Sequence, residues 1–287
     1  LRQVDYAAAA ARFERAETLA RDDGLVHAEF AALQFRAYLE LTFRHVGEAQ
    51  ALLARLERHP ARGHADGAMN YSVAQTMHAQ LRGDVAGALA HAESGLRAVE
   101  RVGAQYFTAV FPALFASALA DAGQTDRARR IIATSRELSR GSYLETMESQ
   151  LCLEEAYVSL VDGDAPSAHE RLAHGLALAV ADRRRTAYVH RIVTRKPVLL
   201  ATALSAGIEV DHVRELIRRW RIAPPDHHVP GWPWPIEVRT LGSFEVRRDD
   251  APIEFGRKAP RKTLALLKAI VARGGSAPES ALIDTFW

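Results

Sequence analysis

The sequence predicts a mostly α-helical protein, in which a stack of helical hairpins precedes a small α+β unit. Three observations predict this fold class. Residues 1–221 are rich in alanine, the residue of highest helix propensity, and show no strand-like alternation. The same stretch contains a repeat with a period of 40 residues. A proline-rich segment then separates it from a C-terminal region in which the hydrophobic period is two.

The 40-residue period is clearest at three turns. In each, a glycine is followed five residues later by an alanine: Gly83 with Ala88, Gly123 with Ala128, and Gly163 with Ala168. Glycine tolerates the positive φ that ends a helix, and a small residue early in the next helix leaves room for a partner helix. Asp84 and Asp164 are placed to cap the helix that follows. Looser copies surround Ala49 and Ala9.

A repeat of this length indicates one helical hairpin, which buries its apolar face only by stacking on its neighbours. We therefore expect an α-solenoid domain over residues 1–221. It is regular over residues 3–182 and closes with an irregular helical pair over residues 184–221, whose helix Pro197 should kink. The spacing resembles tetratricopeptide repeats, in the longer form found in MalT-like signalling regulators. That resemblance implies a repeat domain that binds a protein partner or a small-molecule inducer.

The segment 222–235 has a different composition. It contains five prolines, which forbid helix and favour a stiff, extended connector. We interpret it as the linker between two domains, and we expect its two tryptophans to dock on a neighbouring surface.

Residues 236–287 alternate apolar and polar residues before becoming helical again. We expect strands at Ile236–Thr240, Phe244–Val246 and Ile253–Phe255. A helix should then span Ala259–Ala272, and Pro278 should open another that reaches the end of the chain.

Four motifs of this region occur in a fixed order: Leu241-Gly-Ser-Phe-Glu-Val246, Phe255-Gly-Arg-Lys-Ala259, Leu264-Ala-Leu-Leu267 and Leu282-Ile-Asp-Thr-Phe-Trp287. Together they resemble the start of an OmpR/PhoB-type winged-helix DNA-binding domain, in the version of SARP-like regulators. The resemblance implies a four-stranded sheet, three helices and a wing, with the third helix in the major groove. Because the chain stops during the second helix, residues 236–287 correspond to the N-terminal part of such a domain, which is incomplete.

Basic residues accumulate here, with no acidic residue between Glu254 and Glu279. The candidates for DNA phosphate contacts are Arg257, Lys258, Arg261 and Lys262. A solvated helix face is the alternative interpretation.

A second basic cluster comprises Arg183, Arg184, Arg185, Arg191, Arg195 and Lys196. It is interpreted first as a solvated or interdomain face, and otherwise as a site for an anionic ligand or DNA.

Phe107, Phe111 and Phe115 form a stripe with a spacing of four residues on one expected helix. The stripe is interpreted as core packing, with a ligand groove as the alternative; Tyr71, Tyr143 and Tyr157 have the same two interpretations. Cys152 is expected to be a small core residue. The histidines are scattered, so no metal site is predicted, and no catalytic motif is present. We therefore expect no enzyme and no cofactor in this chain.

The remaining features limit the class of protein. The net charge is only +2, the single cysteine excludes a disulfide framework, and no apolar run is long enough to cross a membrane.

The chain begins at Leu1 without methionine and ends at Trp287 inside an apolar segment, so we expect a piece truncated at both ends. The predicted function is part of a cytoplasmic bacterial transcription regulator that binds DNA in the full-length protein. The family resemblance further implies an upstream nucleotide-binding domain, missing here, as the place for ATP. The alternative is a tetratricopeptide scaffold for protein–protein interactions without DNA binding. Homo-oligomerisation is left open.

Overall fold

The computed structural model describes residues 5–140, 147–181, 196–226, 228–240, 242–249, 251–254 and 261–286. These residues are mostly helical and include a small three-stranded antiparallel sheet. The chain divides into two compact units, Leu1–Trp232 and Pro233–Trp287. The division falls inside the proline-rich segment 222–235.

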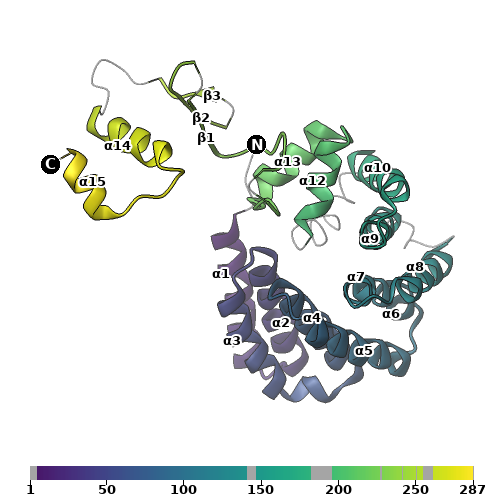
Figure 1. The fold of residues 1–287 in the computed structure, drawn as a ribbon. Helices are drawn as coiled ribbons and strands as arrows, with labels where there is room; N and C mark the ends of the chain where they lie inside the picture. The colour runs from purple at the N-terminus through teal and green to yellow at the C-terminus, as the bar shows by residue number, and fades with distance from the viewer. Residues whose placement is uncertain are drawn as a thin grey trace. The chain divides into compact units, whose positions relative to one another are not determined.

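In its described residues, the first unit consists mainly of α-helices, with two short 3-10 helices among them (Figure 1). Its elements are α1 (Tyr6–Asp22), α2 (Val26–Thr42), α3 (Val46–Arg58), η1 (Pro60–Gly63), α4 (Ala65–Leu81), α5 (Val85–Val102), α6 (Gln105–Val110), η2 (Pro112–Phe115), α7 (Ala116–Asp121), α8 (Thr125–Ser139), α9 (Glu148–Val161), α10 (Ala165–Ala181), α12 (Pro197–Ser205) and α13 (Val210–Trp220).

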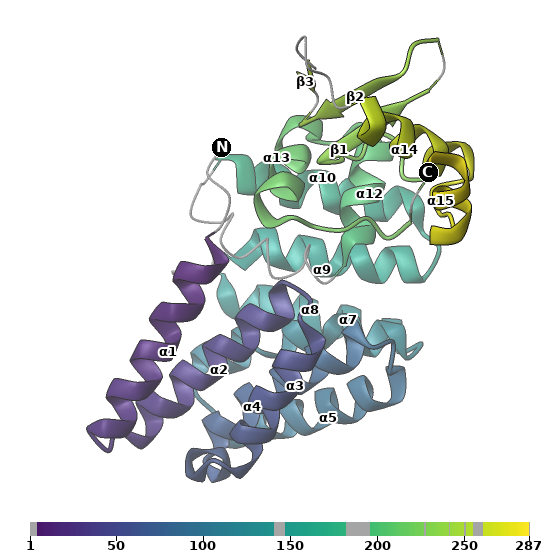
Figure 2. The same ribbon diagram turned by 90° about the vertical axis from the view of Figure 1, so that its left-hand side faces the viewer.

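Helices that follow one another in the sequence pack side by side, as α1 to α3 show in Figure 2. The most extensive contacts join α4 to α5, α9 to α10 and α1 to α2. Contacts also join helices that are two apart, such as α2 with α4, α5 with α7 and α7 with α9. Neighbouring helices therefore bury their apolar faces against one another, and the buried apolar residues form several clusters in the unit.

The repeated glycines lie in the turns between helices. Gly83, Gly123 and Gly163 have φ angles of 72°, 77° and 77°, in the left-handed region that glycine adopts without strain. The repeated alanines Ala88, Ala128 and Ala168 are fully buried, as is Ala49. A side chain at these positions faces a neighbouring helix, which explains why the residue is small.

Two of these turns also carry the predicted caps. Asp84 Oδ1 accepts from the backbone N–H of Gly87 at 2.8 Å, and Asp164 Oδ1 accepts from that of Ser167 at 3.1 Å. Each carboxylate satisfies one of the N–H groups that the first turn of a helix leaves without an internal partner.

The structure corrects two expectations about proline. The phenylalanine stripe was assigned to one helix, but Pro112 interrupts it, and the segment is divided into α6, η2 and α7. Proline has no N–H for the helical ladder, so the backbone tightens into a 3-10 turn. Pro197 was expected to kink a helix, but it is the first residue of α12, where the missing N–H costs nothing.

The segment between the last helix of the first unit and the first strand has no regular structure among its described residues. Ile222 and Trp232 are buried, at 6% and 5% exposure. Arg214 of α13 donates to the backbone oxygen of Gly231 at 3.3 Å. One of the two linker tryptophans is thus packed as part of the first unit.

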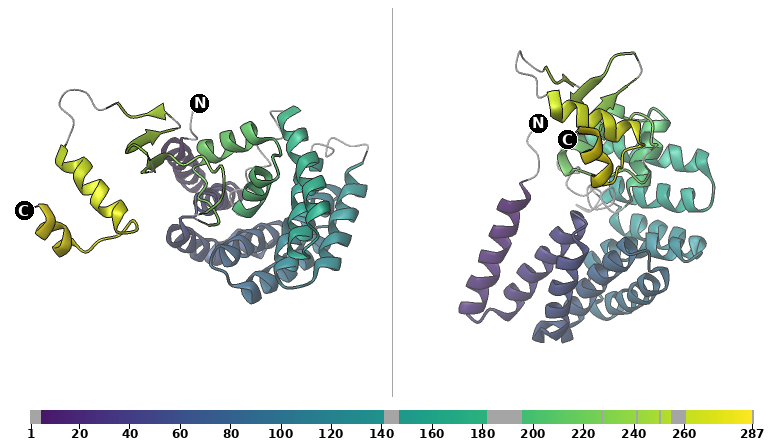
Figure 3. Two further views of the ribbon diagram at one scale, coloured as in Figure 1. Left: turned by 45° about the horizontal axis from the view of Figure 1, so that its top comes forward. Right: turned by 60° about the vertical axis from the view of Figure 1, so that its left-hand side comes forward.

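The second unit contains strands β1 (Ile236–Arg239), β2 (Glu245–Arg248) and β3 (Ala251–Pro252), followed by helices α14 (Arg261–Ala272) and α15 (Glu279–Phe286) (Figure 3). The sheet is antiparallel in the order β1-β2-β3, with Val238 opposite Val246. The third strand lies earlier than expected, although Ile253 still donates its N–H to Val246 O at 2.8 Å. The described residues include three strands, where the resemblance implies four.

None of the helices in the described part of the chain is both long and apolar enough to span a lipid bilayer.

Candidate functional site

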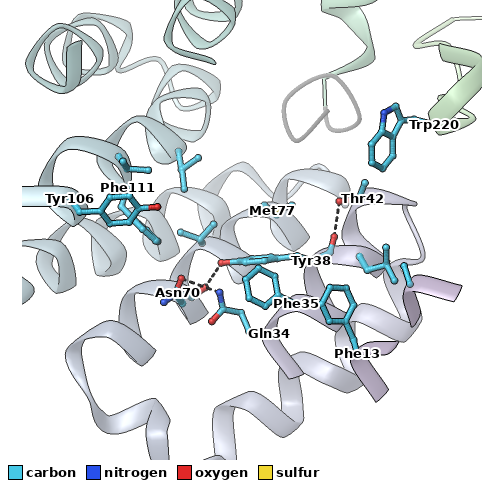
Figure 4. Close-up of a pocket in the computed structure, with 15 residues that line it drawn as sticks. Phe13, Gln34, Phe35, Tyr38, Thr42, Asn70, Met77, Tyr106, Phe111 and Trp220 are labelled. Carbon is cyan, nitrogen blue, oxygen red and sulfur yellow. Dashed lines mark hydrogen bonds between the residues drawn. The ribbon is translucent and has the colours of Figure 1, made fainter. Parts of the chain in front are cut away.

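One hollow in the first unit is an apolar cavity with a volume of about 360 Å³ (Figure 4). Residues from α1, α2, α4, α6, η2 and α13 line it, so it is assembled from helices that are far apart in the sequence. The described lining residues are Ala9, Phe13, Gln34, Phe35, Tyr38, Leu39, Thr42, Asn70, Val73, Met77, Tyr106, Val110, Phe111, Leu114 and Trp220.

Aromatic rings dominate the wall of the cavity. The rings of Phe13 and Phe35 are stacked, with centroids 5.7 Å apart and planes inclined by 11°. Phe35 meets Tyr38 edge to face at 6.2 Å. In Figure 4, Tyr106 lies at one end of the cavity and Trp220 at the other. Phe35 and Tyr106 are large apolar side chains that are 42% and 43% exposed, so the cavity presents apolar surface that the fold itself does not cover.

One edge of the cavity is polar. The amide Nε2 of Gln34 donates to Asn70 Oδ1 at 3.0 Å, and the hydroxyl of Tyr38 donates to the backbone oxygen of Asn70 at 3.1 Å. Thr42 Oγ1 donates to the backbone oxygen of Tyr38 at 2.7 Å. The first two bonds join α2 to α4, the bond from Gln34 orients the carboxamides at the cavity wall, and the third lies within α2.

The described lining contains no Asp, Glu, Lys, Arg or His. Within this described part, the wall carries no formal charge, and its polar groups are carboxamides, hydroxyls and the indole N–H of Trp220. A cavity with this lining favours an uncharged guest, because an ion would lose its hydration without gaining a counter-charge.

The phenylalanine stripe predicted from the sequence is divided between two roles. Phe111 lines the cavity, at the end that also contains Tyr106. Phe115 is fully buried and packs against Gly95 of α5, where a Cβ would lie 2.1 Å from its Cζ. Phe107 packs against the cluster that contains Met69. The groove interpretation therefore fits Phe111, and core packing fits Phe115.

A polar network joins α4, α7 and α9 to the residue that precedes α12. Lys196 Nζ lies 2.8 Å from Asp121 Oδ2 and 3.0 Å from the hydroxyl of Tyr157. Gln80 donates to Asp121 Oδ2 at 2.9 Å and to Ser117 Oγ at 3.1 Å. Burial, reinforced by the Asp121 carboxylate, raises the pKa of Tyr157 and keeps its hydroxyl protonated. We call these residues the Asp121–Lys196 network.

This network corrects the interpretation of Lys196. The sequence grouped it with an arginine cluster on a solvated or interdomain face, but its side chain is only 12% exposed and is paired with Asp121. The other members, Arg183, Arg184, Arg185, Arg191 and Arg195, lie outside the described residues, as does Tyr143. Tyr71 is a core residue with Arg62 above its ring at 4.5 Å.

Of the residues predicted to contact DNA phosphates, Arg261 and Lys262 occupy the exposed first turn of α14. Arg257 and Lys258 lie outside the described residues. The same helix carries Lys268, whose Nζ lies 4.6 Å from the ring centroid of Phe244. This contact joins the helix to the chain just before β2.

The structure also brings together three side chains of metal-ligating type that the sequence did not group. Potential ligand atoms of Glu148, Cys152 and His174 lie within 4.8 Å of one another. Arg136 Nε already donates to both carboxylate oxygens of Glu148, at 2.9 and 3.0 Å. Burial and the charge of Glu148 raise the pKa of Cys152 to about 12, so the thiolate that a metal prefers is disfavoured. We assign no metal to this cluster.

No family model, no curated protein and no solved structure matches the chain.

Sequence reasoning missed most of the cavity. Phe13, Tyr38 and Trp220 carry no local signal that separates them from core residues, because they meet only when α1, α2 and α13 are in place. Phe111 was found because it belonged to a regular stripe.

Proposed function

We propose that the chain is part of a transcription regulator. In this proposal, the first unit is a tetratricopeptide-like α-solenoid that receives a signal, and the second unit begins a winged-helix domain that binds DNA in the full-length protein. The regulator acts in the cytoplasm, and a nucleotide-binding domain precedes the repeats.

The observation that carries the proposal is the ordered motif run between Leu241 and Trp287, which follows a 40-residue helical repeat. The order of elements in the second unit, three short antiparallel strands and then two helices, agrees with the start of a winged-helix domain. The exposed Arg261 and Lys262 on α14 supply positive charge for phosphate contacts.

The cavity supports the sensory role. Trp220, one of its lining residues, is the last residue of α13, and α13 is the last helix before the second unit. Arg214, on the same helix, is hydrogen-bonded to Gly231. A molecule in the cavity would therefore contact the helix that leads into the connection between the two units.

Duplex binding by the full-length protein tests the proposal. Fluorescence anisotropy with labelled promoter DNA should show binding that weakens steeply with salt. Replacing Arg261 and Lys262 together by alanine should lower the salt slope by about two and weaken binding on all sequences alike. Arg101→Ala, at an exposed arginine of the helical unit, is the matched control and should change neither quantity. The absence of salt-dependent duplex binding would contradict the transcriptional role.

The aromatic cavity is also the observation that favours a second candidate, a tetratricopeptide scaffold for protein–protein interactions. In that case the full-length protein would capture a partner through the helical unit and show no affinity for DNA. The anisotropy experiment separates the two candidates.

A further inference from the structure

We propose that the cavity between α1, α2, α4, α6 and α13 binds a neutral, flat, largely aromatic small molecule. This inference rests on the proposed sensory role, for which it names the class of ligand. Binding in the cavity can be measured separately, because it does not require DNA.

The size of the cavity sets the size of the ligand. Its volume of about 360 Å³ lies in the range of sites for drug-sized molecules, which bury most of their surface in mainly apolar pockets. A protein surface that recognised another folded protein would instead present a broad patch. The dimensions therefore favour a single small molecule.

The rings of the wall set the shape of the ligand. Phe13 and Phe35 are stacked nearly parallel, and Phe35 presents its exposed ring to the cavity edge. A flat aromatic ligand gains the most binding free energy when it stacks on such rings or meets them edge to face. Trp220 and Tyr106, at opposite ends, extend the aromatic surface over the length of the cavity.

The absence of charge from the described lining sets the charge of the ligand. A carboxylate, phosphate or ammonium group would lose its water there and find no partner of opposite sign among the described lining residues. A peptide segment is disfavoured for a related reason, because its backbone N–H and C=O groups need partners. Both oxygens of Asn70 at the polar edge already accept hydrogen bonds, from Gln34 and Tyr38.

Two fluorescent probes test the ligand class on the chain as it exists. N-phenylnaphthylamine is neutral, and anilinonaphthalene sulfonate has the same ring system with an added negative charge. The neutral probe should bind saturably at one site, with energy transfer from tryptophan. The sulfonate should bind the same site about tenfold more weakly or worse, a difference of about 1.4 kcal/mol. Equal or tighter binding of the sulfonate would overturn the proposal.

A matched pair of variants on α1 locates the site. Ala9 lines the cavity, whereas Ala7 is exposed on the same helix. Ala9→Phe should fill part of the cavity and weaken the neutral probe by about tenfold, whereas Ala7→Phe should leave its affinity within about twofold. Equal effects of the two substitutions would place the probe elsewhere and refute the assignment.

A third variant tests the site with a substitution that should not disturb the fold. Phe35 is 42% exposed, so Phe35→Ala should leave the circular dichroism and thermal unfolding of the chain close to the wild type while removing a stacking surface. It should weaken the neutral probe by about fivefold or more. Unchanged affinity in this variant also counts against the proposal. If the probe fails to bind while the full-length protein still binds duplex DNA, the ligand class is wrong and the transcriptional role stands. If the probe binds as expected while the full-length protein shows no duplex binding, the transcriptional role is wrong and the ligand class stands.

Discussion

Lys196 Nζ lies 2.8 Å from Asp121 Oδ2, although the two residues are 75 positions apart in the sequence. Lys196 immediately precedes α12, and Asp121 ends α7, while Tyr157 of α9 donates its hydroxyl to the same carboxylate. The ion pair therefore ties the last helical pair of the first unit to the middle of the helical array. Its side chains are 12% and 17% exposed, so water screens the pair only weakly.

Removing one partner of this pair should destabilise the helical unit. Asp121→Ala leaves Lys196 and Tyr157 without their common acceptor, and we expect the free energy of unfolding to fall by about 2 kcal/mol, measured by urea denaturation. Adding Lys196→Met to that variant should restore part of the loss, because it removes the largely buried ammonium charge that Asp121 neutralised. Asp126→Ala, at a side chain that is 87% exposed, is the control and should have little effect. Equal stability of the Asp121 and Asp126 variants would contradict the prediction.

Glu17 should make the stability of the helical unit sensitive to acid. Its side chain is 4% exposed and is paired with Arg21, Arg36 and Arg55, so it joins α1 to α2 and α3. Burial raises the pKa of this carboxyl, but the hydrogen bonds from Arg55 and Arg36 outweigh burial and hold the pKa below its usual value. A carboxyl with a lowered pKa stabilises the folded state above its unfolded pKa, and this stabilisation is lost as the pH falls through the folded pKa.

We therefore expect Glu17→Gln to be destabilised by about 2 kcal/mol at pH 7 and to differ less from the wild type below about pH 4. Denaturant unfolding at a series of pH values measures both quantities. Glu14→Gln on the same helix, at a side chain that is 66% exposed, should show no comparable change. If the loss of stability in Glu17→Gln relative to the wild type stays constant down to pH 3, the effect is not electrostatic.

Gly95 and Phe115 should be sensitive to a single methyl group. A Cβ at Gly95 would lie 2.1 Å from Phe115 Cζ, and Phe115 is fully buried. Gly95→Ala should lower the free energy of unfolding by about 2 kcal/mol, although alanine is the better helix former. Gly47→Ala in α3, where nothing lies within 4 Å of the added carbon, is the matched control and should raise stability by about 0.5 kcal/mol. Thermal unfolding compares the two, and a stabilised Gly95→Ala would refute the close approach.

Cys152 should be inert in the folded protein. It is fully buried, its Sγ donates to Glu148 Oε1 at 3.2 Å, and its pKa is raised to about 12 by burial and by the neighbouring carboxylate. Thiol reagents attack the thiolate, so Ellman's reagent at pH 8 should react slowly with the native chain and rapidly, with one equivalent, in urea. Because the chain has one cysteine, Cys152→Ser gives the blank. Rapid reaction of the native protein would mean that the thiol is accessible.

Local features of the fold could be predicted from the sequence because they depend on neighbouring residues alone. Glycine at positions 83, 123 and 163 permits the positive φ of a helical turn, and Asp84 lies within reach of the first turn of α5. The proline-rich segment and the change of period after it are equally local. Proline was harder to interpret, since Pro112 divides a helix and Pro197 begins one, and the outcome depends on where the preceding segment ends.

The chemistry of the candidate site was decided by the tertiary structure. Phe13, Tyr38 and Trp220 line one cavity, and Lys196 reaches Asp121, only because the packing of the first unit brings distant helices together. Phe111 and Phe115 share one stripe in the sequence, yet one borders the cavity and the other fills the space above Gly95. Most helices and the glycine turns follow from local sequence, since backbone conformation depends largely on adjacent residues. The cavity and its neutral lining follow from packing between residues far apart in the chain, which no local pattern records.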